Sequence, residues 1–155
     1  MNCERGFRKN LPIGRNAKSS SICWRALPGE LKRIGQLGED LAVRFLEASR
    51  ANLVDRNIRP GTGHGVRGEL DILCMDGTTL CVVEVKTLRR RGSGMTPGMN
   101  VTAAKQHQIV MLTQLWLAQN PQPEDVGIRF DVIEVTLGTR GTPDITWHKG
   151  AFLAA

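Results

Sequence analysis

Two largely apolar stretches in the middle of the chain alternate charged with apolar side chains at one end, as β-strands do. They run from Glu69 to Met75 and from Leu80 to Thr87. Such alternation is typical of strands, because successive side chains point to opposite faces of a sheet. The residues between them begin with Asp76-Gly77, a strong signal for a hairpin turn. The pattern therefore predicts two adjacent antiparallel strands.

The same alternation decides which polar side chains share a face of this hairpin. A two-residue loop at the turn sets Asp71 diagonal to Glu84. A four-residue loop pairs Met75 with Leu80 and sets the two carboxylates directly opposite each other. Lys86 shares the face of Glu84 because it lies two residues further along the strand. Both turn geometries therefore put Asp71, Glu84 and Lys86 on one face.

Two carboxylates that face each other on a sheet are destabilising unless something compensates their charge. Mg²⁺ is usually held by one or two protein carboxylates together with substrate phosphate and water. Asp71 and Glu84 therefore suit a Mg²⁺ or Mn²⁺ site beside a phosphodiester, with Lys86 placed to orient or deprotonate the attacking water. The alternative is a solvated cross-strand pair of Glu84 and Lys86, because the spacing Glu-x-Lys recurs by chance.

Apolar residues recur at helical spacing upstream of the hairpin and predict a helix from Ile34 to Ala48. Glu39 falls at the border of the apolar face, from which its carboxylate can lean toward the sheet. The alternative is a surface glutamate that the helix dipole favours near the helix start. The expected apolar face comprises Ile34, Leu37, Leu41, Phe45 and Ala48, and the expected solvent face Gln36, Asp40, Arg44 and Glu47.

The remaining elements complete an α/β fold. A strand is predicted near 52–58, a helix near 102–120, a strand near 128–137 and a last short strand near 144–148. Thr102 is the expected N-cap of the second helix, and Asn120-Pro121 ends it. A long helix between two strands allows a parallel crossover. We therefore expect a mixed central β-sheet flanked by helices, in the order α-β-β-β-α-β-β, and we do not expect Asp131 to be catalytic.

Basic residues follow the second hairpin strand and open the second predicted helix. Arg89, Arg90 and Arg91 lead into a glycine- and serine-containing loop, and Lys105 and Gln106 lie in the first turn of the helix. Cations beside a metal site suit a phosphate backbone. These five residues are therefore the predicted contacts to nucleic acid. The alternative for so short a run of charge is a solvated loop.

Length and charge favour one domain with a basic tail. The chain has 155 residues, 41% of them hydrophobic, which suits one soluble core, and no run approaches a transmembrane helix in length. The net charge is +6, but residues 1–33 hold eight Lys or Arg against two acids and the remainder holds thirteen of each. We expect a disordered tail over 1–30 and a single domain over 31–150. Three interpretations of the tail stay open: a basic arm for nucleic acid, a start placed too far upstream, or a sequence that mimics a transit peptide.

The four cysteines do not indicate a metal site, because no Cys-x-x-Cys pair exists. Cys74 and Cys81 point away from the carboxylate face by alternation, and they are directly opposed if Met75 pairs with Leu80. We expect a reduced, buried pair that behaves as two small hydrophobic residues. His64 is expected to be a loop residue. The expected neighbours of the cysteines are Leu70, Ile72, Val83 and Val85.

An ordered series of short motifs between about Ile34 and Leu137 resembles the YraN family of small bacterial proteins. That family is identified as a member of the PD-(D/E)xK nuclease superfamily and is similar to archaeal Holliday junction resolvases. The motifs are Gly35-Gln36-Leu37-Gly38-Glu39-Asp40-Leu41-Ala42, Arg56-Asn57, Gly68-Glu69-Leu70-Asp71, Val83-Glu84-Val85-Lys86-Thr87, Lys105-Gln106 and Arg129-Phe130-Asp131-Val132.

The resemblance implies a restriction-endonuclease-like core and assigns roles to individual residues. Asp71 and Glu84 would be the metal ligands, Lys86 the catalytic lysine, and Glu39 the helix carboxylate that completes a Mg²⁺ or Mn²⁺ site, with Glu69 a less certain participant. It also implies a bacterial cytoplasmic protein and, by analogy with the resolvases, a homodimer. The segment 60–67 is longer and richer in glycine than the corresponding family loop, which bears on the nucleic-acid geometry that would fit.

Several functions remain open at this point. The first is a metal-dependent endonuclease that acts on DNA, including branched or single-stranded structures. The second is a module with a nuclease fold that binds nucleic acid, or a DNA-processing partner, without cutting. The third is an accessory protein whose acidic cluster binds a metal only for stability.

Overall fold

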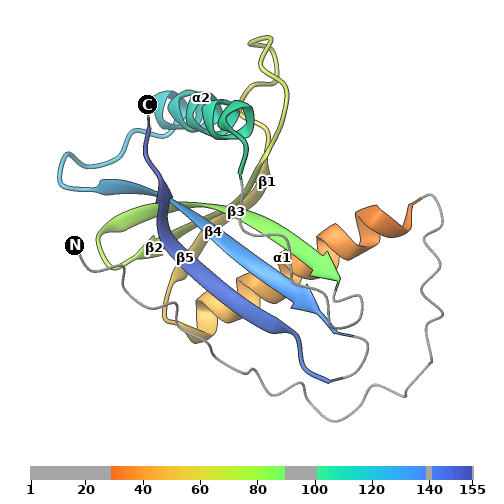
Figure 1. Cartoon of the computed structure of the whole chain (residues 1–155). Helices are drawn as coiled ribbons and strands as arrows, with labels where there is room; N and C mark the ends of the chain where they lie inside the picture. The colour runs from red at the N-terminus through yellow and green to blue at the C-terminus, as the bar shows by residue number, and fades with distance from the viewer. Residues whose placement is uncertain (1–28, 90–100, 139–140, 155) are drawn as a thin grey trace.

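The computed structural model describes residues 29–89, 101–138 and 141–154. Within them the elements follow the predicted order (Figure 1). They form an α/β fold with a five-stranded mixed sheet and two helices. Their bounds are α1 Glu30–Ala48, β1 Asn52–Ile58, β2 Leu70–Asp76, β3 Thr79–Arg89, α2 Ala103–Gln119, β4 Gly127–Leu137 and β5 Asp144–Phe152.

The strands lie in the sheet in their order along the chain, β1-β2-β3-β4-β5. β3 and β4 are parallel, and the other three neighbouring pairs are antiparallel. The parallel pair requires a crossover, and α2 supplies it. The predicted mixed sheet with a parallel crossover is therefore confirmed.

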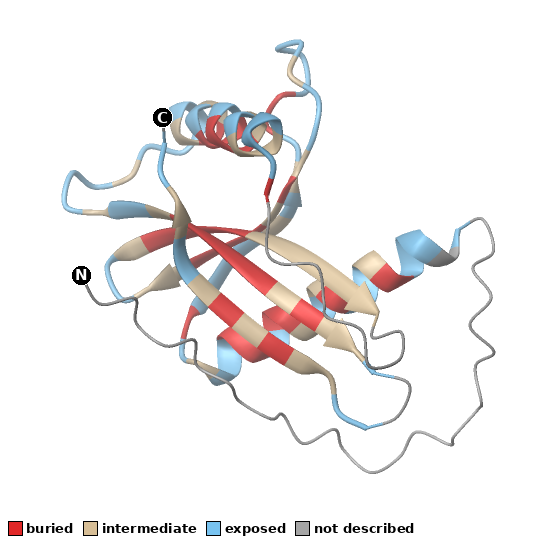
Figure 2. Ribbon diagram, viewed as in Figure 1, coloured by how far each residue is buried: buried red, intermediate tan, exposed pale blue. Residues whose placement is uncertain are grey.

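The two helices cover opposite faces of the sheet (Figure 1). α1 packs through Phe45 and Leu46 against a cluster that includes Ile72, Val83 and Ile133. The face under α2 holds a second cluster, comprising Leu70, Leu73, Leu80, Val82, Val101, Ile109, Val110, Leu112, Trp116, Phe130 and Val132. Figure 2 shows the resulting concentration of buried residues along the central strands. Burial on both faces is what makes the central strands so apolar.

The hairpin adopts the register that places Met75 opposite Leu80. Its turn is tighter than the four-residue loop that the sequence suggested for this register, because Asp76 pairs with Thr79 and leaves two residues between them. Cys74 is directly opposite Cys81, and both thiols are free and buried, as expected. Leu70 is an exception to the predicted alternation, because it belongs to the cluster under α2.

α1 begins at Glu30, four residues before the predicted start, and its buried face is rotated from the predicted one. Leu37 is 43% exposed and Ala48 is also exposed, whereas Gly38 and Ala42 are buried. The helix approaches the sheet through these two small residues, which a count of large apolar side chains does not detect. β5 is also longer than predicted, since it continues to Phe152.

The two remaining predictions concern membrane-spanning helices and the N-terminal tail. Neither helix is long and apolar enough to cross a membrane, among the residues that the structure describes. The predicted tail lies almost entirely outside the described residues, so its disorder and the boundary at residue 30 stay predictions.

Candidate functional site

The candidate site lies where β2 and β3 stop pairing. The last residue pair of their ladder is Ile72 with Val83. Beyond it, the carboxylate of Asp71 accepts a hydrogen bond from the backbone N–H of Val85, with Oδ2 2.8 Å from the nitrogen. Asp71 is therefore held between the two strands by its own side chain, one residue beyond the ladder, where the register points it toward Glu84.

The surroundings of Asp71 disfavour its charged form. Burial, and after it the negative charge of Glu84, raise the pKa of Asp71 from its ordinary 3.8 to about 7. The hydrogen bond from Val85 and the charge of Lys105 partly oppose this rise. Asp71 therefore holds its proton to a much higher pH than an ordinary aspartate does.

A cation from α2 forms an ion pair with Glu84. The ammonium of Lys105 lies 3.2 Å from Oε2 of Glu84, whose side chain is only 13% exposed. Thr102 caps the helix start by accepting from the backbone N–H of Lys105, as predicted. Lys86 is partly buried on the face of Glu84, as the alternation of β3 requires. The predicted trio of Asp71, Glu84 and Lys86 thus occupies one region.

Glu39 reaches this region from the helix on the other face. Burial raises its pKa, and the next largest contribution is the charge of Asp71, so the two carboxylates lie within electrostatic range. A hydrogen bond from the Asn57 side chain lowers it in turn. The approach depends on Gly38, because a Cβ there would overlap the side chain of Thr87 on β3. Glu39 thus comes within electrostatic range of Asp71 from α1.

Asn57 is a site residue that the sequence did not single out for a role. It lies between the pairs Arg56–Ile72 and Ile58–Leu70, so the register places it across from Asp71. Its φ is 54°, a left-handed conformation that is uncommon outside glycine and is best tolerated by asparagine and aspartate. The departure of Leu70 from the expected face coincides with this kink. An asparagine inside an otherwise extended segment was the available signal.

Glu134 and His148 form a second polar pair on the sheet face that carries Glu84 and Lys86. Glu134 is opposite Lys86 in the parallel register of β3 and β4. The His148 Nε2 lies 3.4 Å from Oε2 of Glu134. Both residues are missing from the predicted site, because their position depends on the register between strands far apart in the sequence.

Comparison with known proteins places this chain in a bacterial family. The model of the uncharacterised protein family UPF0102 matches residues 38–135. The chain belongs to UPF0102. A UPF0102 protein of Symbiobacterium thermophilum is 43% identical over 126 residues, which cover 79% of this chain and 98% of that protein. A UPF0102 protein of Geobacter sulfurreducens is 42% identical over 121 residues, or 78% of this chain and 89% of that protein. The expected resemblance to the YraN family is thereby confirmed.

The span that matches UPF0102 contains all four predicted catalytic residues. The donor chemistry suits a hard divalent cation, because the carboxylates of Asp71, Glu84 and Glu39 supply oxygen ligands and the raised pKa of Asp71 would fall beside a cation. Within residues 29–89, 101–138 and 141–154, however, no three acidic, histidine or cysteine side chains lie close enough together to hold an ion between them. Binding would require the carboxylates to converge and Lys105 to leave Glu84.

The residues of this UPF0102 protein that were predicted to contact nucleic acid differ in where they lie relative to the candidate site. Lys105 lies at the site, whereas Gln106 donates through Nε2 to the backbone oxygen of Val101 at 2.8 Å and so stabilises the start of its own helix. Arg89 ends β3 and, by alternation, belongs to the face opposite Glu84. Arg90 and Arg91 lie outside the described residues.

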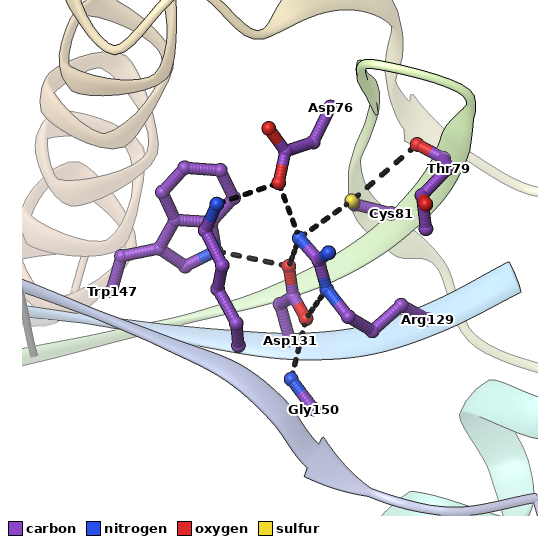
Figure 3. Close-up of polar contacts among 8 residues, drawn as sticks. Asp76, Thr79, Cys81, Arg129, Asp131, Trp147 and Gly150 are labelled. Atoms are coloured by element: carbon purple, nitrogen blue, oxygen red, sulfur yellow. Dashed lines mark hydrogen bonds and ion pairs between the residues drawn. The ribbon is translucent and has the colours of Figure 1, made fainter. Parts of the chain in front are cut away.

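Asp131 lies at the centre of a buried hydrogen-bond network. Its fully buried carboxylate accepts from Nε and Nη2 of Arg129 at 2.8 and 3.0 Å, from Nε1 of Trp147 at 3.0 Å and from the backbone N–H of Gly150 at 2.8 Å (Figure 3). Arg129 also donates to Asp76 at 2.8 Å. This network joins the hairpin turn to β4 and β5 on the α1 face of the sheet, opposite the face of Glu84.

Proposed function

We propose that this protein is a Mg²⁺- or Mn²⁺-dependent endonuclease with a PD-(D/E)xK core, acting on DNA that includes branched or single-stranded structures. The observation that carries the proposal is the meeting of Asp71, Glu84 and Lys86 where β2 and β3 stop pairing. A partly buried carboxylate with a strongly raised pKa beside a second carboxylate is a feature that clusters at functional sites. Membership of UPF0102 supports a nuclease-like fold without fixing an activity.

The roles of the residues follow from their chemistry. Asp71 and Glu84 would hold the cation, and Glu39 would complete its ligands from α1. A bound divalent cation supplies neutralisation of phosphate charge and lowers the pKa of a water molecule. Hydrolysis joins the water oxygen to phosphorus and breaks one phosphorus–oxygen ester bond, which leaves a phosphate monoester and a hydroxyl. Lys86 orients that water or accepts its proton.

A second function is favoured by the contact between Lys105 and Glu84. An ammonium 3.2 Å from a candidate metal ligand already compensates its charge. Together with the absence of a ready-made three-ligand cluster among the described residues, it supports a module that binds nucleic acid without cutting it.

Cleavage assays separate the two functions. Labelled duplex, single-stranded, flap and four-way-junction DNA are incubated with Mg²⁺ or Mn²⁺ and native protein, Lys86→Ala, Asp71→Ala or the exposed-loop control Asp125→Ala. We expect cutting by native protein and Asp125→Ala alone. Equal cutting by all four would reveal a contaminant, and binding without cutting on every substrate would favour the second function.

Calorimetric titration with Mn²⁺ tests the metal site itself. We expect binding by the native protein and by Asp125→Ala that disappears in Glu84→Ala. Binding should also be weaker at pH 6 than at pH 8, because a cation must displace the proton that Asp71 holds up to about pH 7. The metal hypothesis fails if the native protein binds no Mn²⁺ at pH 8.

A further inference from the structure

A hollow of about 760 Å³ lies between the glycine-rich loop that joins β1 to β2 and the start of α2. Figure 1 shows this loop rising beside α2. Lys105 belongs both to the lining of the hollow and to the ion pair with Glu84, so the hollow adjoins the candidate site. The side chains and backbone that line it come from Arg59, Gly61, Thr62, Gly63, Gly65, Val66, Arg67, Gly68, Glu69 and Lys105.

The loop that forms one wall is fastened to α2 at both ends. Gln108 donates through Nε2 to the backbone oxygen of Arg67 at 2.7 Å, and Gln119 donates to that of Pro60 at 3.3 Å. Gly68 packs directly on Gln108, since a Cβ there would lie 2.7 Å from Nε2, and its φ of 124° suits glycine alone. Two glutamines of one helix thus hold a long loop in place, which gives the wall a defined shape.

The loop is also compact internally. The backbone N–H of His64 donates to the oxygen of Gly61 at 2.9 Å, and the hydroxyl of Thr62 donates to the oxygen of Arg59 at 3.0 Å. A Cβ at Gly61 would overlap the carbonyl of Val66, so the two sides of the loop touch. These contacts make the wall a built surface.

The lining carries three cationic side chains and one carboxylate. Arg59 is paired with Glu69 through Nε and Nη2 at 3.0 and 2.9 Å, and Lys105 is paired with Glu84. Arg67 is exposed, and among the described residues no carboxylate forms an ion pair with it. Among the described residues that line the hollow, none has an aromatic side chain. Positive charge without an aromatic platform suits phosphates and not stacked bases.

We propose that this hollow seats the sugar-phosphate backbone of one nucleic-acid strand beside the carboxylates, with Arg67 as a phosphate contact. The inference rests on the proposed function to the extent that the bound strand is the one presented to Asp71 and Glu84. Because only the backbone is contacted, binding through the hollow is independent of base sequence. The strand passes from Arg67 to Lys105 and so reaches the Glu84 carboxylate.

Fluorescence anisotropy tests the assignment without cleavage. Native protein, Arg67→Ala and Arg44→Ala are titrated in EDTA onto labelled 20-nucleotide strands, of mixed sequence and of thymidine alone, and onto duplex, from 50 to 200 mM salt. Arg44 is the matched control, because it is an exposed arginine on α1, across the sheet from α2. RNA of the mixed sequence is titrated as well, to distinguish a DNA backbone from an RNA backbone as the strand that the hollow binds.

We expect Arg67→Ala to reduce the slope of log affinity against log salt by about 0.7 on single strands and about 0.9 on duplex. Affinity at 0.1 M salt should fall about five- to eightfold, equally for both sequences, while Arg44→Ala matches the native protein. An unchanged slope for Arg67→Ala, an equal loss in Arg44→Ala, a loss confined to one sequence, or no binding by the native protein would overturn the assignment.

The outcomes for the hollow and for the nuclease are separable. Weaker binding by Arg67→Ala in a protein that cuts nothing with Mg²⁺ or Mn²⁺ would support the hollow and refute the enzyme. Cutting by a native protein whose Arg67→Ala variant binds with the native slope would support the enzyme and refute the hollow.

Discussion

The carboxylate of Asp71 accepts a hydrogen bond from the backbone N–H of Val85 at 2.8 Å, beyond the last residue pair of the β2–β3 ladder. A side chain thus takes the place of a strand partner, and it fixes the carboxylate where Glu84 and Glu39 also act on it. This contact fixes the position of Asp71 at the end of the paired part of the hairpin.

The contribution of Asp71 to the free energy of unfolding should fall as pH rises from about 4 to 7. The folded state keeps the Asp71 proton up to a pKa of about 7, whereas the unfolded chain releases it near 3.8. The folded state therefore binds more protons at this group in this window, and the Asp71 contribution to the free energy of unfolding decreases with pH. Asp71→Asn removes this group. Between pH 4.5 and pH 8, the free energy of unfolding of Asp71→Asn should therefore rise relative to that of the native protein by a few kcal/mol, in order of magnitude.

Urea unfolding in EDTA across this range measures the effect, with Asp125→Asn as an exposed control that should follow the native curve. A parallel pH dependence of native protein and Asp71→Asn would show that the Asp71 pKa is not raised.

Removing the ammonium of Lys105 should have opposite effects on metal and on nucleic acid. Lys105→Ala frees Glu84 from its ion pair, whose partly exposed geometry corresponds to about 1 kcal/mol or less. Mn²⁺ binding at pH 8 should tighten by up to about fivefold, because the cation no longer competes with the ammonium. DNA binding should weaken, because a cation of the hollow is lost. Calorimetry and anisotropy measure the two effects, and Lys105→Arg should keep near-native DNA binding. Weaker Mn²⁺ binding by Lys105→Ala would contradict the competition.

Gly38 should be intolerant of a side chain, unlike its neighbour on the same helix. A Cβ at Gly38 would overlap Thr87, whereas nothing lies within 4 Å of a Cβ at Gly35. Gly38→Ala should lower the free energy of unfolding by about 1–3 kcal/mol through overpacking. Gly35→Ala should raise it by up to about 1 kcal/mol, because alanine favours the helix.

Denaturant unfolding of the two variants provides the comparison. Adding Thr87→Ala to Gly38→Ala should recover part of the loss, because it removes the atoms that clash. Equal stabilities for the two alanine variants would mean that α1 does not contact β3 through Gly38.

Asp131 should contribute far more to the free energy of unfolding than an acidic residue in an exposed loop does. Asp131→Ala leaves Arg129 and Trp147 without the buried carboxylate that accepts from both. Breaking a buried charge pair in this way costs about 3–5 kcal/mol. Glu124→Ala, in the exposed loop before β4, should be nearly neutral. Thermal and urea unfolding measure both variants, and a loss below about 1 kcal/mol for Asp131→Ala would refute the role of the network.

The sequence by itself determined the elements and the shared face of the candidate catalytic residues. Side-chain alternation and the Asp-Gly turn are local, so the grouping of Asp71 with Glu84 and Lys86 and the burial of Cys74 and Cys81 followed without knowledge of distant contacts. The caps of α2 were equally local, because Thr102 bonds a backbone group three residues away.

Only the tertiary structure decided how distant elements meet at that face. The rotation of α1 is set by the fit of Gly38 and Ala42 to the sheet, so the periodicity of large apolar residues misplaced Leu37. The parallel register of β3 and β4 brought Glu134 opposite Lys86. The packing of α2 brought Lys105 to Glu84, and it brought Gln108 and Gln119 to the glycine-rich loop. These contacts join residues tens of positions apart, and they depend on close packing and register between elements, which local propensity does not encode.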